Sequence, residues 1–169
     1  MDNTADIQLI GDAKRLHRSE KGGVGYYYRQ YIASSGTKNC VPTAIAILQG
    51  AEYYTAIDKM LLYNGFRISP TKGTWTERFI DSKYGSGFKK VYSSWLHGDQ
   101  PERRTPAGFA ALNPEGKFLI QLRGHVIALI NGTVYEFEKK KMNGQRVHKV
   151  WKLIDESVLI NQLKTNSYL

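Results

Sequence analysis

The chain has 169 residues, of which 41% are apolar and 12% aromatic, and a formal net charge of +9. This length fits one domain with its own core, and this composition excludes wholesale disorder. The single cysteine excludes an internal disulfide and a zinc site built from several cysteines. No stretch reaches the roughly 18 consecutive apolar residues of a transmembrane helix, so we expect no membrane partner.

The first 25 residues are polar and end in a glycine-rich run, so we expect a loosely held arm at 1–25 followed by a single domain at 26–169. The arm lacks the basic start, apolar run and cleavage site of a signal peptide, and we therefore expect a cytoplasmic protein. The aromatic run Tyr26–Ile32 favours a short strand.

Helices are expected next. Asn39 is a good N-cap, Pro42 fits a first helical turn, and Gly50 suits a helix end, so Cys40 is expected at the start of a buried helix. A second helix is expected from Glu52 to Tyr63, stopped by Asn64-Gly65, and a shorter third one over 76–83.

Strands dominate the second half. We expect strands at 88–92, 117–122, 125–130, 133–137 and 146–153, with Asn131-Gly132 as a two-residue hairpin turn. Thr105-Pro106 is typical of a helix start, here of a short helix to Leu112, and a last helix is expected over 155–163. This order predicts an α+β fold, with N-terminal helices that carry the cysteine packed on a C-terminal antiparallel sheet.

Cys40 and His125 form the pattern that carries chemistry. A helix N-terminus stabilises the reactive thiolate, and a histidine can accept and return its proton. A two-residue turn at Asn131-Gly132 would put Glu138 opposite His125 and Glu136 diagonally beside it on the same strand face, at roughly 7–8 Å. Each residue also has an ordinary interpretation: a buried small side chain for the cysteine, an edge residue for the histidine and a solvated strand residue for either glutamate.

Two stretches, NCVPTAIAILQG and GHVIALINGTVYEF, resemble the papain-like cysteine peptidase superfamily. The likeness is nearest to its small divergent bacterial and bacteriophage members and to the peptidase domains of family C39, in which a cysteine starts a helix and a later histidine leads a strand. The match covers about 26 of the 169 residues. It implies a papain-like fold, a protein or peptide substrate and no cofactor, and it suits a phage-encoded protein acting in the host cytoplasm.

The resemblance implies that Cys40 is the nucleophile, His125 the general base and Glu136 the orienting residue of a catalytic triad. Papain-like enzymes usually carry an oxyanion-hole glutamine about six residues before the cysteine, and here that position is Ser34. Asn39, Gln30 and Thr37 are the other candidates for this donor. The third triad member is usually asparagine or aspartate, so a glutamate is a second departure. Both departures bear on turnover more than on fold.

The positive charge suggests a second class of function. Basic residues cluster over 138–152 and over 14–21, and with nearby tyrosines they could bind nucleic acid, although no known nucleic-acid motif is present. The alternative to an enzyme is therefore a catalytically silent papain-like domain that binds nucleic acid or an acidic protein. His17, His97 and His148 show no short spacing typical of metal ligands, so no metal site is expected. Gly85-Ser86-Gly87 is interpreted as a turn, and Trp75, Trp95 and Trp151 are expected in the core or the wall of a cleft.

Overall fold

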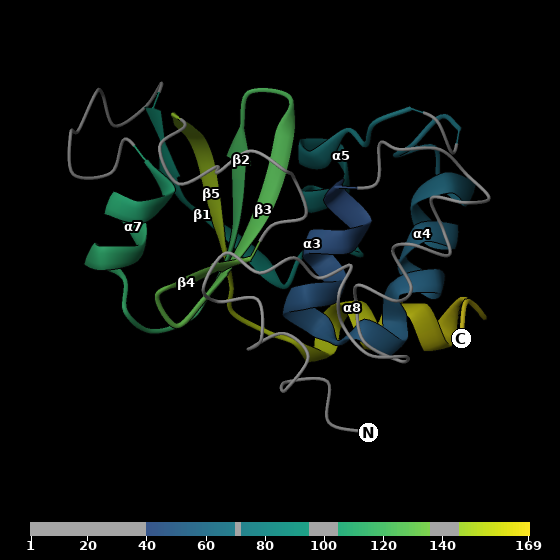
Figure 1. The fold of residues 1–169 in the computed structure, drawn as a ribbon. Coiled ribbons are helices and arrows are strands. Elements are labelled where there is room, and N and C mark those ends of the chain that lie inside the picture. The colour runs from purple at the N-terminus through teal and green to yellow at the C-terminus, as the bar shows by residue number, and fades with distance from the viewer. Residues whose placement is uncertain (1–39, 70–71, 95–104, 136–145) are drawn as a thin grey trace.

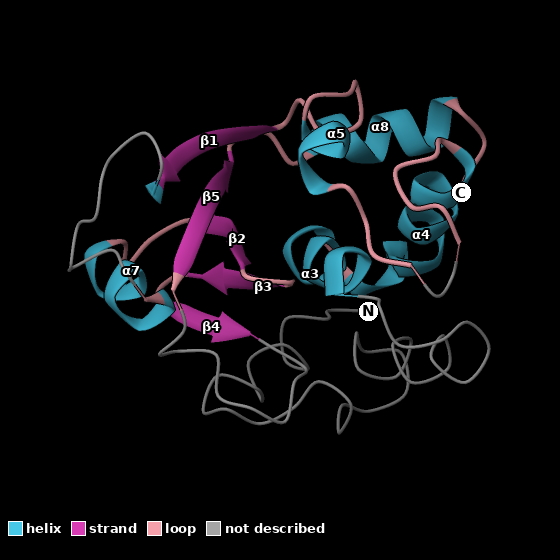
Figure 2. Cartoon of the chain, turned by 90° about the horizontal axis from the view of Figure 1, so that it is seen from above, coloured by secondary structure: helices cyan, strands magenta, loops and turns pink. Residues whose placement is uncertain are grey.

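The computed structural model describes residues 40–69, 72–94, 105–135 and 146–169. These residues form an α+β fold built on an antiparallel sheet of five strands (Figure 1). Seen from above, the helices α3, α4, α5 and α8 lie on one side of the sheet and α7 lies on the other (Figure 2). The expected fold class is confirmed at this level, while the arm at 1–25 and the strand at 26–32 fall outside the described residues.

The central helix is α3 (Cys40–Gln49), and it begins at the cysteine. All residues from Val41 to Leu48 are buried, as expected of a helix surrounded by other elements. Gly50 follows with a φ of 130°, which glycine adopts far more readily than other residues. The helix therefore ends where the sequence predicted.

Three further helices complete this layer. The expected helix at 52–63 is divided into a short 3-10 turn, η2 (Ala51–Tyr53), and α4 (Tyr54–Tyr63). Asn64 closes α4, because its Nδ2 donates to the carbonyl oxygen of Met60 at 2.8 Å. The third helix, α5 (Thr76–Ile80), is shorter than expected, and α8 (Ser157–Thr165) starts two residues later than expected.

The sheet has the order β1-β5-β2-β3-β4, so the last strand lies between the first two. Its strands are β1 (Phe88–Ser93), β2 (Lys117–Leu122), β3 (His125–Ile130), β4 (Thr133–Tyr135) and β5 (Val147–Leu153). In the turn between β3 and β4, Asn131 and Gly132 have φ values of 48° and 80°, and Ile130 pairs with Thr133. Two consecutive positive φ values are typical of a type I′ hairpin turn, and the predicted two-residue turn is confirmed.

Helix α7 (Pro106–Leu112) covers the second face of the sheet. Its first turn is capped as predicted, because the Thr105 side chain accepts a hydrogen bond from the Gly108 N–H at 3.1 Å. Phe109 of α7 packs against Phe118 with ring centroids 5.5 Å apart.

Two apolar cores result, one on each face of the sheet. The larger core lies between the helices and residues such as Val126, Ala128 and Trp151. The smaller core lies between α7 and residues such as Ile127 and Leu129. Neighbouring residues of β3 therefore belong to different cores, as the alternation of side chains along a strand requires.

The glycine-rich segment at 85–87 is a tight turn, as predicted. A Cβ on Gly85 would lie 2.4 Å from the Cα of Ile80, and one on Gly87 would lie 2.3 Å from the carbonyl oxygen of Asp155. This close return of the chain ends α5 at Ile80, short of the expected residue 83.

The tryptophans differ in environment. Trp151 is 1% exposed and belongs to the larger core, whereas Trp75 is 49% exposed. Of the two expected places for Trp75, the core is wrong, because Trp75 sits at the solvent side of the α5 start, where the Arg78 guanidinium lies 4.3 Å from its ring centroid. A place in the wall of a cleft stays a prediction. Trp95 falls outside the described residues. None of the described helices combines the length and the apolar character needed to cross a bilayer.

Candidate active site

Cys40 is the first residue of α3 and is half-buried, unlike the fully buried residues that follow it. The first turn of α3 contains no acidic side chain. The unpaired N–H groups at a helix N-terminus carry partial positive charge, which favours an anion such as a thiolate at this position. The described helix start therefore suits a reactive cysteine.

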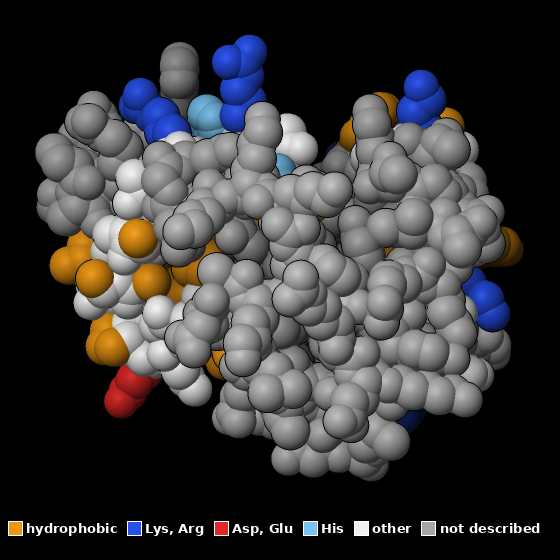
Figure 3. All heavy atoms as spheres, in the orientation of Figure 1, with side chains coloured by type: hydrophobic (Ala, Val, Ile, Leu, Met, Phe, Trp, Pro, Cys, Tyr) orange, Lys and Arg blue, Asp and Glu red, His pale blue; other side chains and the backbone are white. Residues whose placement is uncertain are grey.

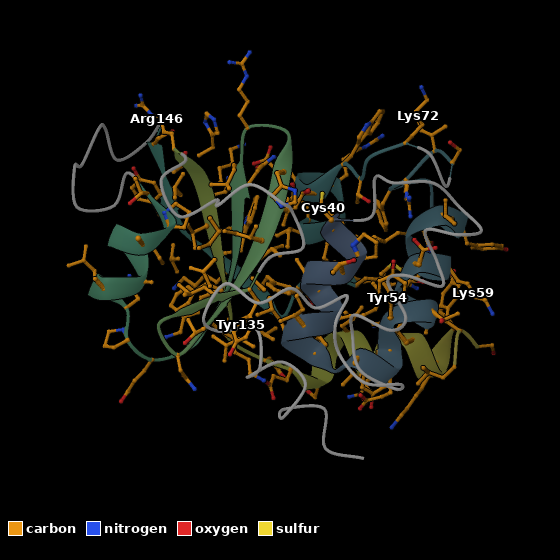
Figure 4. The ribbon with its side chains drawn as sticks, viewed as in Figure 1. Cys40, Tyr54, Lys59, Lys72, Tyr135 and Arg146 are labelled. Atoms are coloured by element: carbon orange, nitrogen blue, oxygen red, sulfur yellow. The ribbon has the colours of Figure 1, made fainter. Side chains whose placement is uncertain are left out.

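Lys117 defines the direction of α3 relative to β3. Its Nζ donates to the carbonyl oxygen of Leu48, near the C-terminal end of α3, at 3.2 Å. Lys117 also pairs with Ile130, the last residue of β3. Because α3 packs along β3, the C-terminal ends of the two elements lie together and their first residues, Cys40 and His125, lie at the opposite end (Figure 1). Figure 4 labels Cys40 at that end of α3.

The lengths of the two elements put Cys40 near the beginning of β3. From Leu48 to Cys40 the helix rises about 12 Å, at 1.5 Å per residue. From Ile130 to His125 the strand extends about 17 Å, at 3.3 Å per residue. Both lengths bring the first residues of α3 and β3 to the same end of the sheet.

The side chain of His125 starts on the sheet face away from α3. His125 pairs with Leu122, and Leu122 belongs to the smaller core together with Ile127. Val126, in contrast, belongs to the larger core with α3. An imidazole that serves Cys40 must therefore reach it around the beginning of β3. His125 is half-buried and its Nε2 atom is shielded from solvent.

A cluster of polar residues that the sequence analysis did not predict lies on the α3 side of the sheet, at this same end. Its members are Gln121, Lys149, Glu77 and Lys90. Gln121 of β2 pairs with Val126 on one side and with Lys149 of β5 on the other. The Lys149 Nζ lies 2.6 Å from Oε1 of Glu77 on α5, and the Nζ of Lys90 lies 3.2 Å from the same oxygen. The two ammonium groups, Lys149 foremost, hold the pKa of Glu77 below its ordinary value of 4.5. In the sequence, this cluster is indicated by Gln121 alone, because it is a polar residue inside the apolar run FLIQL.

His148 also lies near this end. Gln121 pairs with Lys149 but Leu122 pairs with Val147, so His148 is the extra residue of a β-bulge in β5. Leu122 of β2 pairs with Val147 of β5 on one side and with His125 of β3 on the other, so these three residues are cross-strand neighbours. The backbones of β5 and β3 are about 10 Å apart, from two strand spacings of about 4.8 Å. His125 and His148 are 23 residues apart in the chain, so the sequence alone did not indicate that they lie at the same end of the sheet.

Three of the proposed site residues, Glu136, Ser34 and Asn39, fall outside the described residues, as do Gln30, Thr37 and Glu138. The hairpin register that placed Glu136 beside His125 is observed as far as the pair Ala128 and Tyr135. Burial raises the pKa of Tyr135. The role of Glu136 stays a prediction.

The basic clusters are described only in part. Arg146, Lys149 and Lys152 belong to the described residues, whereas 138–145 and 14–21 do not. Lys149 is engaged with Glu77, and the Nζ of Lys152 lies 5.8 Å from the ring centroid of Phe118. Figure 3 shows side chains of the lysine and arginine colour, and histidine beside them, at the edge of the molecule above the sheet. Within the four described ranges, no cluster of three or more His, Cys, Asp or Glu side chains is arranged to hold a metal ion.

Comparisons with protein-family models, with curated proteins and with solved structures give no match for this chain. The likeness to papain-like peptidases therefore rests on the two stretches of sequence quoted above.

Proposed function

We propose that this protein is a papain-like thiol hydrolase, a cysteine peptidase or related amide hydrolase, with Cys40 as nucleophile and His125 as general base. The observation that carries the proposal is the packing of α3 along β3, with the first residues of both elements at one end. Glu136 is proposed as the residue that orients the imidazole, and Ser34 or Asn39 as an oxyanion donor beside the Cys40 N–H.

The proposed reaction is acyl transfer through a thioester. The Cys40 thiolate attacks the carbonyl carbon of an amide, forming a C–S bond, and the carbonyl oxygen becomes an oxyanion. As the C–N bond breaks, His125 gives the leaving amine the proton it took from the thiol. A water molecule, deprotonated by His125, then attacks the thioester and releases the acid and the thiol. One oxyanion donor is worth about 2.7–4 kcal/mol in such chemistry, so the identity of that donor controls the rate.

The proposal makes one geometric demand. Because strand alternation starts the His125 side chain on the α7 side of the sheet, the imidazole has to turn around the first residue of β3 to meet the thiol. Gly124, which precedes it, has a φ of 68°, so the chain turns sharply at this point.

The same feature favours a second candidate, a catalytically silent domain that binds an acidic partner. If the imidazole stays on the α7 side, Cys40 is not coupled to His125, and the positive charge of +9 would serve recognition of an acidic partner. The two candidates differ in one measurable property, the coupling of Cys40 to His125.

The deciding experiment is the rate of Cys40 alkylation by iodoacetamide between pH 5 and pH 9. It compares the wild type with His125→Ala and with His148→Ala, the other histidine in the described part of the chain. For an enzyme we expect fast alkylation that persists below pH 7 in the wild type and in His148→Ala, and that slows at least tenfold in His125→Ala.

Equal rates in the wild type and His125→Ala, both rising as an ordinary thiol titrates near pH 8.5, would remove the enzyme proposal. A loss confined to His148→Ala would assign the base to the bulge residue instead. A positive result leads to a screen of peptide and amide substrates, in which Cys40→Ser must abolish turnover.

A further inference from the structure

The loop between α4 and α5 presents apolar side chains to solvent. Ile68 is 69% exposed and Trp75 is 49% exposed. Figure 3 shows apolar side chains beside a lysine or arginine at the upper right, where Figure 4 labels Lys72. We name Ile68, Trp75, Lys72 and Arg78 the loop surface. Large apolar side chains grouped on a surface usually mark an interaction site.

The described residues of this loop, 64–69 and 72–75, are fixed from below. Arg67 and Thr74 form an isolated antiparallel bridge, and the Trp75 N–H donates to the Phe66 carbonyl at 2.8 Å. Arg67 is completely buried, lies 2.5 Å from the Asp58 carboxylate and donates from Nε to the Lys72 carbonyl at 2.8 Å. Alternation about the bridge turns Arg67 inward and Ile68 outward. The surface is therefore held in place before any partner arrives, which lowers the entropic cost of binding.

The charges beside the apolar side chains are positive. Lys72 and Arg78 are exposed, and the Arg78 guanidinium covers one face of the Trp75 ring at 4.3 Å. Two acids lie in or beside this segment: Asp58 is buried and paired with Arg67, and Glu77, next to Arg78, is engaged by Lys149 and Lys90. A second copy of this chain would bring another +9 and be repelled, whereas an acidic partner would be attracted.

We propose that the loop surface binds an acidic polypeptide segment that carries an apolar side chain. The apolar side chain packs on Ile68 and Trp75, and flanking carboxylates meet Lys72 and Arg78. Tryptophan and arginine are the residue types that most often dominate the binding energy of protein interfaces. This surface does not depend on the chemistry of Cys40.

A single-stranded nucleic acid fits the same surface less well. Bases stack on flat aromatic rings, but the more exposed side chain, Ile68, is aliphatic, and Arg78 already covers one face of Trp75. Lys72 and Arg78 also provide few phosphate contacts, whereas nucleic-acid affinity grows with the number of such contacts.

The test is fluorescence anisotropy with the full chain and a fluorescein-labelled peptide, Gly-Asp-Glu-Leu-Phe-Glu-Asp-Gly. A second peptide replaces Leu-Phe by Ser-Gly, and a fifteen-nucleotide oligo-dT probes nucleic acid. We expect saturable binding of the first peptide, at least tenfold weaker binding of the second, and at least tenfold weaker binding of the first peptide to Trp75→Ala and to Ile68→Ser. Leu112→Ser is the matched control, because Leu112 is also 49% exposed but lies on α7, across the sheet.

A second measurement is made on the wild type, so that its result does not depend on whether a variant folds. The indole N–H signal of Trp75, assigned with Trp75→Phe, should shift as the first peptide is added. Three results would each overturn the proposal. The first is the absence of saturable peptide binding, and the second is equal binding by Leu112→Ser and Trp75→Ala without a shift of the Trp75 signal. The third is oligo-dT binding that Trp75→Ala and Ile68→Ser abolish, which would favour nucleic acid as the partner.

Discussion

Removal of the Arg67 cation is the sharpest stability test that the structure offers. Arg67→Met leaves the Asp58 carboxylate, whose side chain is 3% exposed, without its guanidinium partner, and leaves the Lys72 carbonyl without its Nε donor. Breaking a buried ion pair in this way costs about 3–5 kcal/mol. For a chain of this size each kcal/mol lowers Tm by about 2–4 °C, so we expect a fall of roughly 6–20 °C.

The assay is urea unfolding followed by far-UV circular dichroism, together with thermal melts. Asp58→Leu combined with Arg67→Met should recover most of the loss, because neither charge is then left buried alone. Lys90→Met is the control at an exposed pair with Glu77 and should cost less than about 1 kcal/mol. A loss below about 1 kcal/mol for Arg67→Met, or additive losses in the double variant, would refute the assignment of this pair as a buried anchor of the loop.

Three further predictions concern backbone and surface. Gly87→Ala should lower the free energy of unfolding by about 1–3 kcal/mol, since its Cβ would lie 2.3 Å from a carbonyl oxygen, whereas Gly73→Ala, with open space around the new Cβ, should be neutral or stabilising in the same urea assay. The folded-state pKa of Glu77 is lowered, so its ion pairs stabilise the fold above pH 4.5 and this contribution is lost as pH falls through the folded pKa. The stability difference between wild type and Glu77→Gln should thus be small, sensitive to salt and lost as pH falls through the folded pKa of Glu77; a difference that grows on acidification would contradict it. Thr105→Ala should cost about 1 kcal/mol and Thr105→Ser much less, because only the latter keeps the cap acceptor; equal losses would argue against a capping role.

Short sequence motifs predicted helices and turns well where a residue type has a specific conformational role, as at a helix N-cap or a tight turn. Thr105-Pro106 predicted the start of α7, and Asn131-Gly132 predicted the turn and its register. Bounds were less certain where a tertiary contact decides them, as at α5, which the return of the chain at Gly85 cuts short. The position of β5 between β1 and β2 has no local signal, because strand order depends on packing between distant segments.

The buried pair of Asp58 and Arg67 that anchors the loop is partly indicated by the sequence. Asp58 lies on the same helical stripe as Tyr54, Ile57 and Leu61, all buried residues of α4. A carboxylate on an apolar stripe requires a partner, since an unpaired buried charge is costly. The pattern alone identifies the need, whereas the partner, Arg67, belongs to a loop whose path the pattern does not give.

The candidate site was predictable in its parts and not in its assembly. The sequence predicted that Cys40 begins a helix and that His125 begins a strand, and the elements start at these residues. The run VIALI is apolar on both faces of the sheet, so no pattern could indicate which face α3 covers. That choice decides the route by which His125 would reach Cys40, and the coupling of the two residues stays a prediction.

The helix and the imidazole make separate contributions to a reactive thiol. The N-terminus of α3 favours a thiolate through its own N–H groups, and no acid in its first turn opposes this. Fast alkylation of Cys40 below pH 7 would therefore be explained by the helix alone and would not demonstrate a catalytic pair. Only the difference between wild type and His125→Ala isolates the imidazole, and only turnover demonstrates that it returns a proton to a leaving group. A protein with the first property and without the second would be a reactive thiol on a binding domain, in which the acidic partner of the loop surface, rather than a scissile bond, would define the function.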